Sequence, residues 1–440
     1  MPFDYLIHGR RRRLVLCAVA VAVALPVIYS GIVELAVARL QREGTINSLR
    51  LATRYEPGDS ELWWVLASHY ERDPIHRNLS QAAACLEQAT RLDPGWSRYW
   101  EDLGQVQEEE GDISAAREDY QRAKRVGPGL ADVAWRYGSF LLRHGDMGVA
   151  ASEIRGALQG VSDLTPSAIS QFQRAGAGVQ FIVDRVLPPS SSVLLDAIDY
   201  FVARKENDAA VASWEKLAGL GQEVRLARSF DLIQNLIDAN RLHDADRVWR
   251  QALTLAGRPN EAEAGGSLIF NGGFEHDLVN GGFDWRQTPA AGTAFDLVTD
   301  VTEAGSQSAR VVFDGSANVD YGNLVQYVPL TPGEGYRFTA YMRTDSISSD
   351  SGPQFQLQSC SNPLQVVAET PAMTGTHPWT EAQAEFRASS ALDCLRVVLR
   401  RKPSELLASK ISGTVWVDDV RLQKAATYCS ARPLSAAASE

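Results

Sequence analysis

The sequence predicts a chain of several domains: a single N-terminal transmembrane helix, an α-helical repeat region and a C-terminal antiparallel β-sandwich. Three observations carry this prediction. An uncharged run follows four consecutive arginines near the start, a pattern of large and small residues recurs every 34 residues in the middle, and short alternating runs separated by turn residues fill the last third. Hydrophobic residues make up 45% of the 440, which is typical of a folded chain and excludes wholesale disorder.

The net charge of the chain limits which classes of molecule we expect it to bind. The chain carries 43 Lys and Arg against 54 Asp and Glu, a formal charge of −11. Binding of nucleic acid needs a basic surface that displaces counterions from phosphates. We therefore expect no nucleic-acid partner.

The N-terminus predicts a membrane anchor. Arg10–Arg13 precede an apolar run from Leu14 to Val33, whose length matches the roughly 30 Å of a hydrocarbon layer. We assign 1–13 as a cytoplasmic basic segment and 14–36 as the anchor, since arginines stay on the cytoplasmic side. This predicts a single-pass protein of a bacterial inner membrane with its bulk in the periplasm. The alternative is a cleaved signal peptide, because Ala22-Val23-Ala24 could serve as a cleavage site.

The middle of the chain is built from repeats. Three sets of positions share the order of large, small and turn residues: Trp63, Leu66, Ala67, Tyr70, Ala82, Leu86, Ala89 and Pro94; then Trp100, Leu103, Gly104, Ala116, Tyr120, Ala123 and Pro128; then Gly138, Ala150, Ile154 and Ala157. Weaker copies follow at Ala210, Trp214 and Leu217, and at Ala245, Trp249 and Ala252, whereas 160–192 is irregular. Small residues at fixed places suit helices that cross closely.

These positions resemble the tetratricopeptide-repeat family over 44–257. The resemblance implies a solenoid of paired helices whose concave face holds an extended peptide or another protein. The alternative is a rigid spacer that lifts the last domain off the membrane.

Composition changes near residue 257, and 258–266 read as a linker. Beyond it, alternating runs predict the strands of an antiparallel sandwich over 267–424, and 425–440 form a flexible tail. The predicted strands include Ala309–Phe313, Leu324–Leu330, Tyr336–Arg343, Gln354–Gln358, Leu395–Arg400 and Thr414–Leu422.

Three segments in order are similar to jelly-roll carbohydrate-binding modules with a galactose-binding-like fold. The opening is Leu268–Glu275 with Gly281–Trp285, the middle is Leu330–Phe338, and the closing strand is Thr414–Leu422. The resemblance implies a carbohydrate on the concave face. Because sugar rings stack on aromatic faces, the candidate contacts are Trp285, Tyr321, Tyr341 and Trp379, with Arg343 and Arg400 as polar partners. Any one of them could instead be a core residue, Trp285 above all.

The same resemblance implies a structural calcium ion. The matching positions are Glu275 and one of Asp418 or Asp419, and calcium takes several hard oxygen ligands. The alternative is that these carboxylates only pair with arginines.

The cysteines of the sandwich region predict a disulfide. In an oxidising compartment, Cys360 and Cys394 are expected to form a disulfide, with Cys429 as the competing partner.

The sequence lacks H-E-x-x-H, G-x-S-x-G and phosphate-loop motifs, so we expect no enzyme.

Together these features predict a non-catalytic adaptor in surface polysaccharide assembly or export. Its repeats would hold a protein and its sandwich would bind a glycan. The alternative is a pure protein scaffold whose sandwich binds no sugar.

Overall fold

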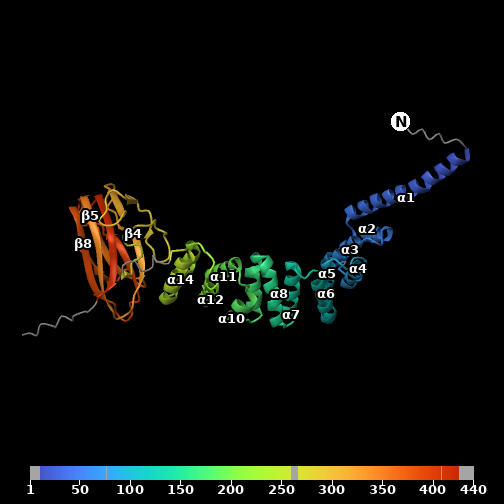
Figure 1. The fold of residues 1–440 in the computed structure, drawn as a ribbon, viewed down its shortest axis with the longest axis horizontal. Coiled ribbons are helices and arrows are strands. Elements are labelled where there is room, and N and C mark those ends of the chain that lie inside the picture. Colours follow the sequence, from blue (N-terminus) through green and yellow to red (C-terminus); the bar gives the residue numbers. More distant parts are fainter. Residues whose placement is uncertain (1–9, 76, 259–265, 408, 426–440) are drawn as a thin grey trace, which may run out of the picture. The chain divides into compact units, whose positions relative to one another are not determined.

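The structure is a computed structural model that describes residues 10–75, 77–258, 266–407 and 409–425. Most of the predicted basic segment, linker and tail lies outside these ranges, as does Cys429. The chain forms two compact units, Met1–Pro188 and Pro189–Glu440, and each is considered by itself. Figure 1 shows helices through the first unit and the start of the second, followed by the strands.

The first unit is entirely helical in its described residues. Its elements are α1 (Arg10–Glu43), α2 (Ile46–Tyr55), α3 (Ser60–Arg72), α4 (Leu79–Leu92), α5 (Ser97–Glu110), α6 (Ile113–Val126), α7 (Ala131–Arg143), α8 (Met147–Gly160), α9 (Thr165–Arg174) and α10 (Val179–Phe181), with a 3-10 turn η1 (Ser162–Leu164) and a π turn η2 (Ile182–Val186).

Helix α1 contains the predicted anchor. Among the described residues it is the single helix long and apolar enough to cross a membrane, over Leu14–Glu43, and its most apolar stretch is wholly exposed. A membrane span and a signal sequence share these properties.

Side-chain caps fix where several helices begin. Asp59 accepts a hydrogen bond from the amide of Glu61 at 2.8 Å, and Asp112 accepts one from Ala115 at 3.0 Å. These carboxylates satisfy amides that the first helical turn leaves without partners. Gly111 ends α5 with φ of 90°, a backbone conformation that favours glycine.

The recurring small residues let paired helices approach closely. A Cβ atom at Gly104 would lie 3.0 Å from the ring of Tyr120, and one at Gly138 would lie 2.8 Å from Ile154. Each glycine therefore provides the space that the large residue of the next helix fills. The same arrangement one period apart explains why both positions follow the repeat.

The irregular stretch 160–192 is mostly helical. Helix α9 is a regular element, but its partner is the single turn α10 followed by the π turn η2. A π turn inserts one residue into the helical spacing, and this shift hides the pattern in the sequence.

The second unit begins with helices and ends with the sandwich. Its helices are α11 (Ser191–Ala203), α12 (Asn207–Ala218), the 3-10 turn η3 (Leu226–Ser229), α13 (Phe230–Asp238) and α14 (Leu242–Leu255). Trp214 and Trp249, the large residues of the weaker repeats, are both buried.

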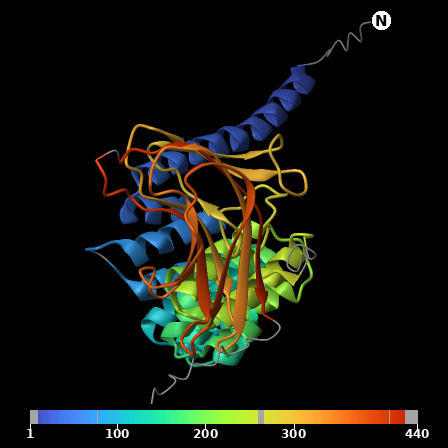
Figure 2. The same ribbon diagram turned by 90° about the vertical axis from the view of Figure 1, so that its left-hand side faces the viewer.

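Two antiparallel five-stranded sheets form the sandwich (Figure 2). The first sheet has the order β1 (Arg286–Gln287), β4 (Tyr321–Pro329), β9 (Cys394–Arg401), β6 (Gln354–Ser359) and β7 (Val366–Glu369). The second has the order β2 (Thr293–Val298), β3 (Ser308–Asp314), β10 (Ser412–Lys424), β5 (Gly335–Ile347) and β8 (Gly375–Arg387). A disulfide joins Cys360, just after β6, to Cys394 at the start of β9.

Alternation along the strands builds the core. Tyr336, Phe338, Ala340 and Met342 of β5 are each 0% exposed, while the residues between them face outward. Each sheet thus buries one face against the other, and the residues between lie on its second face.

The last helices pack directly on the sandwich. The ring of Trp249 lies 5.3 Å from that of Phe270, and a Cβ at Gly282 would meet Trp249 at 2.3 Å. Arg286 of β1 donates a hydrogen bond to Gln234 of α13. Helices α13 and α14 therefore belong to the same compact unit as the strands.

Substitution of two glycines, one at a time, tests how the repeat helices pack. Gly138→Ala should make the chain less stable than Gly156→Ala by about 1–3 kcal/mol, because the added methyl overpacks against Ile154. The matched control lies on α8 with nothing within 4 Å, so its methyl adds only helix propensity. Thermal unfolding followed by the helical circular-dichroism signal measures the difference. Equal melting temperatures would show that the close contact carries no energy.

Candidate functional site

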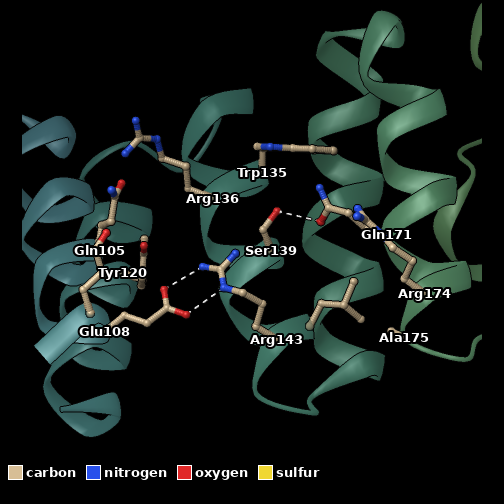
Figure 3. A pocket seen from close by; sticks show the side chains of 12 residues that line it. Gln105, Glu108, Tyr120, Trp135, Arg136, Ser139, Arg143, Gln171, Arg174 and Ala175 are labelled. Atoms are coloured by element: carbon tan, nitrogen blue, oxygen red, sulfur yellow. Dashed lines mark hydrogen bonds and ion pairs between the residues drawn. The ribbon is translucent and has the colours of Figure 1, made fainter. Parts of the chain in front are cut away.

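The first unit contains a groove with a volume of about 960 Å³ (Figure 3). It is lined by residues of α5, α6, α7 and α9, so three successive helix pairs contribute to it. We call it the helical groove. Its lining residues are Gln105, Glu108, Glu109, Tyr120, Trp135, Arg136, Ser139, Leu142, Arg143, Gln171, Arg174 and Ala175.

Ion pairs between neighbouring helices hold the charged lining in place. Arg143 donates from Nε and Nη2 to the two carboxylate oxygens of Glu108 at 2.8 and 2.7 Å. Burial acts to raise the pKa of Glu108, but hydrogen bonds from Arg143 and His144 outweigh it and keep that pKa below its usual value. Glu108 therefore remains ionised and serves as a fixed counter-charge.

Arg136 of α7 is held by carboxylates of α5. Its Nη1 lies 2.9 Å from Asp102, and its Nε lies 3.4 Å from Glu101, which is 2% exposed. Burial raises the pKa of Glu101, because a buried carboxylate loses hydration. Arg136 compensates part of that loss.

A second candidate is the outer face of the first sheet of the sandwich. The ring of Tyr327 on β4 lies between two guanidinium groups, with Arg286 4.7 Å and Arg396 5.8 Å from its centroid. Both guanidinium groups make cation–π contacts with the ring and hold it on this face of the sheet.

On the same sheet, β6 carries a row of amides, Gln354, Gln356 and Gln358, which we call the glutamine row. Strand β9 lies between it and Tyr327, with Arg396 paired to both Tyr327 and Gln358. Phe355 and Leu357 between them belong to the core, so alternation directs the amides to the outer face.

The glutamine row forms one hydrogen-bonded network with an acidic residue. Gln354 and Gln356 donate to Glu369 of β7 at 3.0 and 2.9 Å, and Gln358 donates to Gln356 at 3.1 Å. Hydrogen bonds from Gln356, Lys402 and Gln354 keep the pKa of Glu369 below its usual value, against the effect of burial. The network therefore fixes several donors and acceptors on β6 and β7, and the three glutamines are buried.

Sequence reasoning missed the glutamine row, although its signal was present. The run Gln-Phe-Gln-Leu-Gln from 354 to 358 alternates amides with apolar residues. Amides at every second position of a buried strand place polar groups on a single face.

The outer face of the second sheet holds three of the residues predicted to contact sugar. Arg343 lies over the ring of Trp416 at 5.4 Å, Tyr341 is on the same side of β5, and Trp379 of β8 lies at the register shift that follows the pair Met342–Thr380. Cross-strand ion pairs surround them, such as Arg337 with Glu385 at 2.6 Å. Charges of opposite sign at close range across strands are typical of a solvated face.

Trp285 and Tyr321 are core residues, which corrects their prediction as sugar contacts. Trp285 is 0% exposed, stacks on Phe274 and donates from Nε1 to the carbonyl of Asn271 at 3.1 Å. Tyr321 is 1% exposed, because a register irregularity between Tyr321 and Leu324 directs both side chains inward. Burial raises the pKa of Tyr321.

The two predicted arginine partners do not converge. Arg343 lies on β5 of the second sheet, whereas Arg400 lies on β9 of the first sheet and donates to the carbonyl of Tyr321 at 2.7 Å. Arg400 also pairs with Asp320. The six predicted residues thus divide between two outer faces and the core.

The predicted calcium ligands are partly brought together. A Cβ at Gly273 would lie 3.8 Å from Glu275 Oε1 and 3.9 Å from Asp418 Oδ1, so both carboxylates flank this glycine. Asp419 is separate and pairs with Arg421 at 2.7 Å.

Both flanking carboxylates bind the loop that contains residues 303–306. Asp418 accepts hydrogen bonds from the amides of Glu303 and Ala304 at 2.9 and 3.0 Å, and Glu275 accepts one from Ser306 at 2.9 Å. No group of three or more His, Cys, Asp or Glu residues that could hold a metal occurs in the described ranges. Glu275 and Asp418 would hold a calcium ion only with backbone carbonyls as further ligands.

Some solved structures are similar to part of the chain. A CBM4 module shares 14% identity with a TM-score of 0.28, covering 36% of this chain and 99% of that one. A xylan-binding domain from CBM 22 shares 15% with a TM-score of 0.27, covering 37% and 99%. The C-terminal family 22 carbohydrate-binding module of Clostridium thermocellum Xyn10B shares 16% with a TM-score of 0.25, covering 38% and 98%.

No protein family profile and no curated protein sequence matches the chain. Any functional assignment therefore rests on the residues of this chain.

Chelation tests the calcium prediction. If Glu275 and Asp418 hold calcium, millimolar calcium should raise the melting temperature of the full chain by several degrees over EDTA, because an ion bound only by the folded state stabilises it. Glu275→Gln should remove that response, whereas Glu334→Gln, at an exposed carboxylate, should keep it. Identical melting in calcium and EDTA would leave Glu275 and Asp418 as hydrogen-bond acceptors for their loop.

Proposed function

We propose that this chain is a membrane-anchored, extracytoplasmic and non-catalytic adaptor. Its sandwich binds a carbohydrate, and its helical pairs, which we take to be tetratricopeptide repeats, hold a protein partner. The setting that fits this combination is assembly or export of a surface polysaccharide. The observation that carries the proposal is the outer face of the first sheet, with Tyr327 on β4, Arg396 on β9 and the glutamine row on β6.

The chemistry of this face suits a sugar. A pyranose ring presents an apolar face that stacks on an aromatic ring, and hydroxyl groups that both donate and accept hydrogen bonds. Side-chain amides have the same dual capacity. Tyr327 supplies the ring, while Gln356, Gln358 and Glu369 supply polar partners that are already fixed in place.

A binding role is favoured over hydrolysis by the state of Glu369. A general acid in glycoside hydrolysis needs a raised pKa so that it stays protonated. The hydrogen bonds to Glu369 lower its pKa instead. Its carboxylate therefore serves as an acceptor.

Helix α1 supports the anchor. Its apolar surface is exposed along the whole hydrophobic stretch, as a lipid-facing helix requires. Four arginines at 10–13 precede that stretch, which favours a cytoplasmic N-terminus.

The alternative function is a protein scaffold whose sandwich binds no sugar. One observation favours it: Gln354, Gln356 and Gln358 are only 9%, 2% and 8% exposed. Their network would then serve only to hold β7 on the sheet edge.

Glycan binding distinguishes the two functions. The full chain in detergent micelles should bind at least one class of glycan on a broad array that includes xylan fragments. Tyr327→Ala should weaken that binding about tenfold, because it removes the stacking surface. Tyr341→Ala, on the opposite face, is the matched control.

Either of two results would change the proposal. Loss of binding in Tyr341→Ala rather than Tyr327→Ala would move the site to the second sheet, beside Arg343 and Trp379. A folded chain that binds no glycan would favour the scaffold.

Membrane extraction tests the anchor. We expect the full-length chain to stay with the membrane after an alkaline carbonate wash. Protease added outside spheroplasts should digest the region beyond α1, since the arginines keep the N-terminus inside. Release of a shortened chain into the periplasm would indicate signal-peptide cleavage.

A further inference from the structure

The helical groove has a chemistry that narrows the class of its ligand. We infer that it binds an extended peptide segment in which an acidic residue lies next to a large apolar or aromatic one. This inference rests on the proposed function, because it takes the helical pairs to hold a protein partner. The inference adds the kind of peptide segment that these helical pairs select.

The charges of the groove lining are nearly all neutralised by the protein itself. Glu108 pairs with Arg143 at 2.7 Å, and Glu109 pairs with Arg77. Arg136 is shared by Glu101, Asp102 and Asp132.

Arg174 is the exception among the charged residues that line the groove. It is exposed, and its Nε donates to the carbonyl of Ser170 at 3.3 Å. Within the described part of the chain it forms no ion pair. Its two terminal nitrogens remain available, and a guanidinium group binds a carboxylate with two parallel hydrogen bonds. A ligand carboxylate would complete the charge pairing of the groove.

Trp135 supplies an apolar platform in the same groove. It is half-buried on α7, and in the described residues its ring stacks on no other aromatic ring and its Nε1 has no hydrogen-bond partner. Leu142 of α7 and Ala175 also line the groove. Figure 3 shows Trp135 and Arg174 among the residues that line the groove, and they belong to α7 and α9. A large apolar side chain could therefore pack here beside a carboxylate bound to Arg174.

Polar groups between these two points suit a peptide backbone. Ser139 donates from Oγ to Gln171 Oε1 at 3.2 Å, and the amide nitrogen of Gln171 can donate to a further acceptor. A peptide carbonyl is such an acceptor. An extended segment would thus be contacted through its backbone at Gln171 and through its side chains at Trp135 and Arg174.

The same charged residues of the groove disfavour a basic ligand. It would meet Arg174 as a like charge, and the nearby carboxylates Glu108 and Glu109 already have arginine partners. To bind them it would have to displace those arginines. Charge complementarity therefore favours an acidic segment.

Peptide display tests the inference. A library of random peptides is selected on the full chain in nanodiscs, with empty nanodiscs as the background. We expect enriched peptides to share an Asp or Glu next to Phe, Leu, Ile or Trp. Arg174→Glu should weaken their binding at least about tenfold, because it replaces an ion pair by a repulsion. A peptide with Lys in place of its acidic residue should regain affinity for that variant.

Two further variants make the outcome specific. Arg125→Glu changes charge identically at an exposed arginine of α6 that does not line the groove, and it should keep the wild-type affinity. Trp135→Ala should weaken binding without changing the preference for an acidic residue.

Two results would overturn the inference, and they are distinguishable. Enriched peptides without a shared acidic residue, bound equally by wild type and Arg174→Glu, would refute the ligand class while leaving a protein-binding groove. No enrichment over empty nanodiscs would refute both this inference and the proposed binding of a protein partner by the groove.

Discussion

A large side chain seated on a glycine is the contact that joins one element to the next in both compact units. In the first unit, Tyr120 covers Gly104 and Ile154 covers Gly138. In the second, Trp249 covers Gly282 and so joins α14 to the sandwich. Close approach of this kind depends on the missing Cβ, because protein interiors tolerate little extra volume. Within the first unit, these contacts place the helices that line the groove. Within the second unit, they place the strands against α14.

One-sided burial leaves room for ligands in both units. The helix pairs bury their small residues against one another, and the lining of the groove remains polar or half-buried. Each sheet buries one face, so the residues at alternate positions, such as the glutamine row, remain on the other. The two candidate surfaces use different chemistry. The helical groove has a cation with no acidic partner among the described residues, whereas the sandwich face has a ring held by two arginines and a network of amides.

Much of this fold could be predicted from sequence because its patterns are local. The spacing of Gly104, Tyr120, Gly138 and Ile154 predicted the helix pairs, and alternating runs predicted strands such as Tyr336–Arg343, which lies within β5. The sandwich site could be predicted only in part. A register irregularity near Tyr321 turned that ring into the core, and Trp285 is held inside by its hydrogen bond to Asn271. The register irregularity leaves no trace in the sequence pattern, whereas a core role for Trp285 was already the stated alternative. The sequence also could not show that Arg174 lacks an acidic partner among the described residues. This depends on which arginines find carboxylates on neighbouring helices.

The packing of Trp249 on the sandwich has a mechanical consequence. A carbohydrate-binding domain tethered only by a flexible linker would turn freely and would transmit little force. Here the contacts of Trp249 with Phe270 and of Gln234 with Arg286 connect helices and strands directly. A polymer that pulls on the first sheet would therefore load α13 and α14 through side chains as well as through the backbone. Arg286 is part of this connection and also lies over Tyr327, so tension on the sandwich would act at the same residue that borders the candidate sugar face.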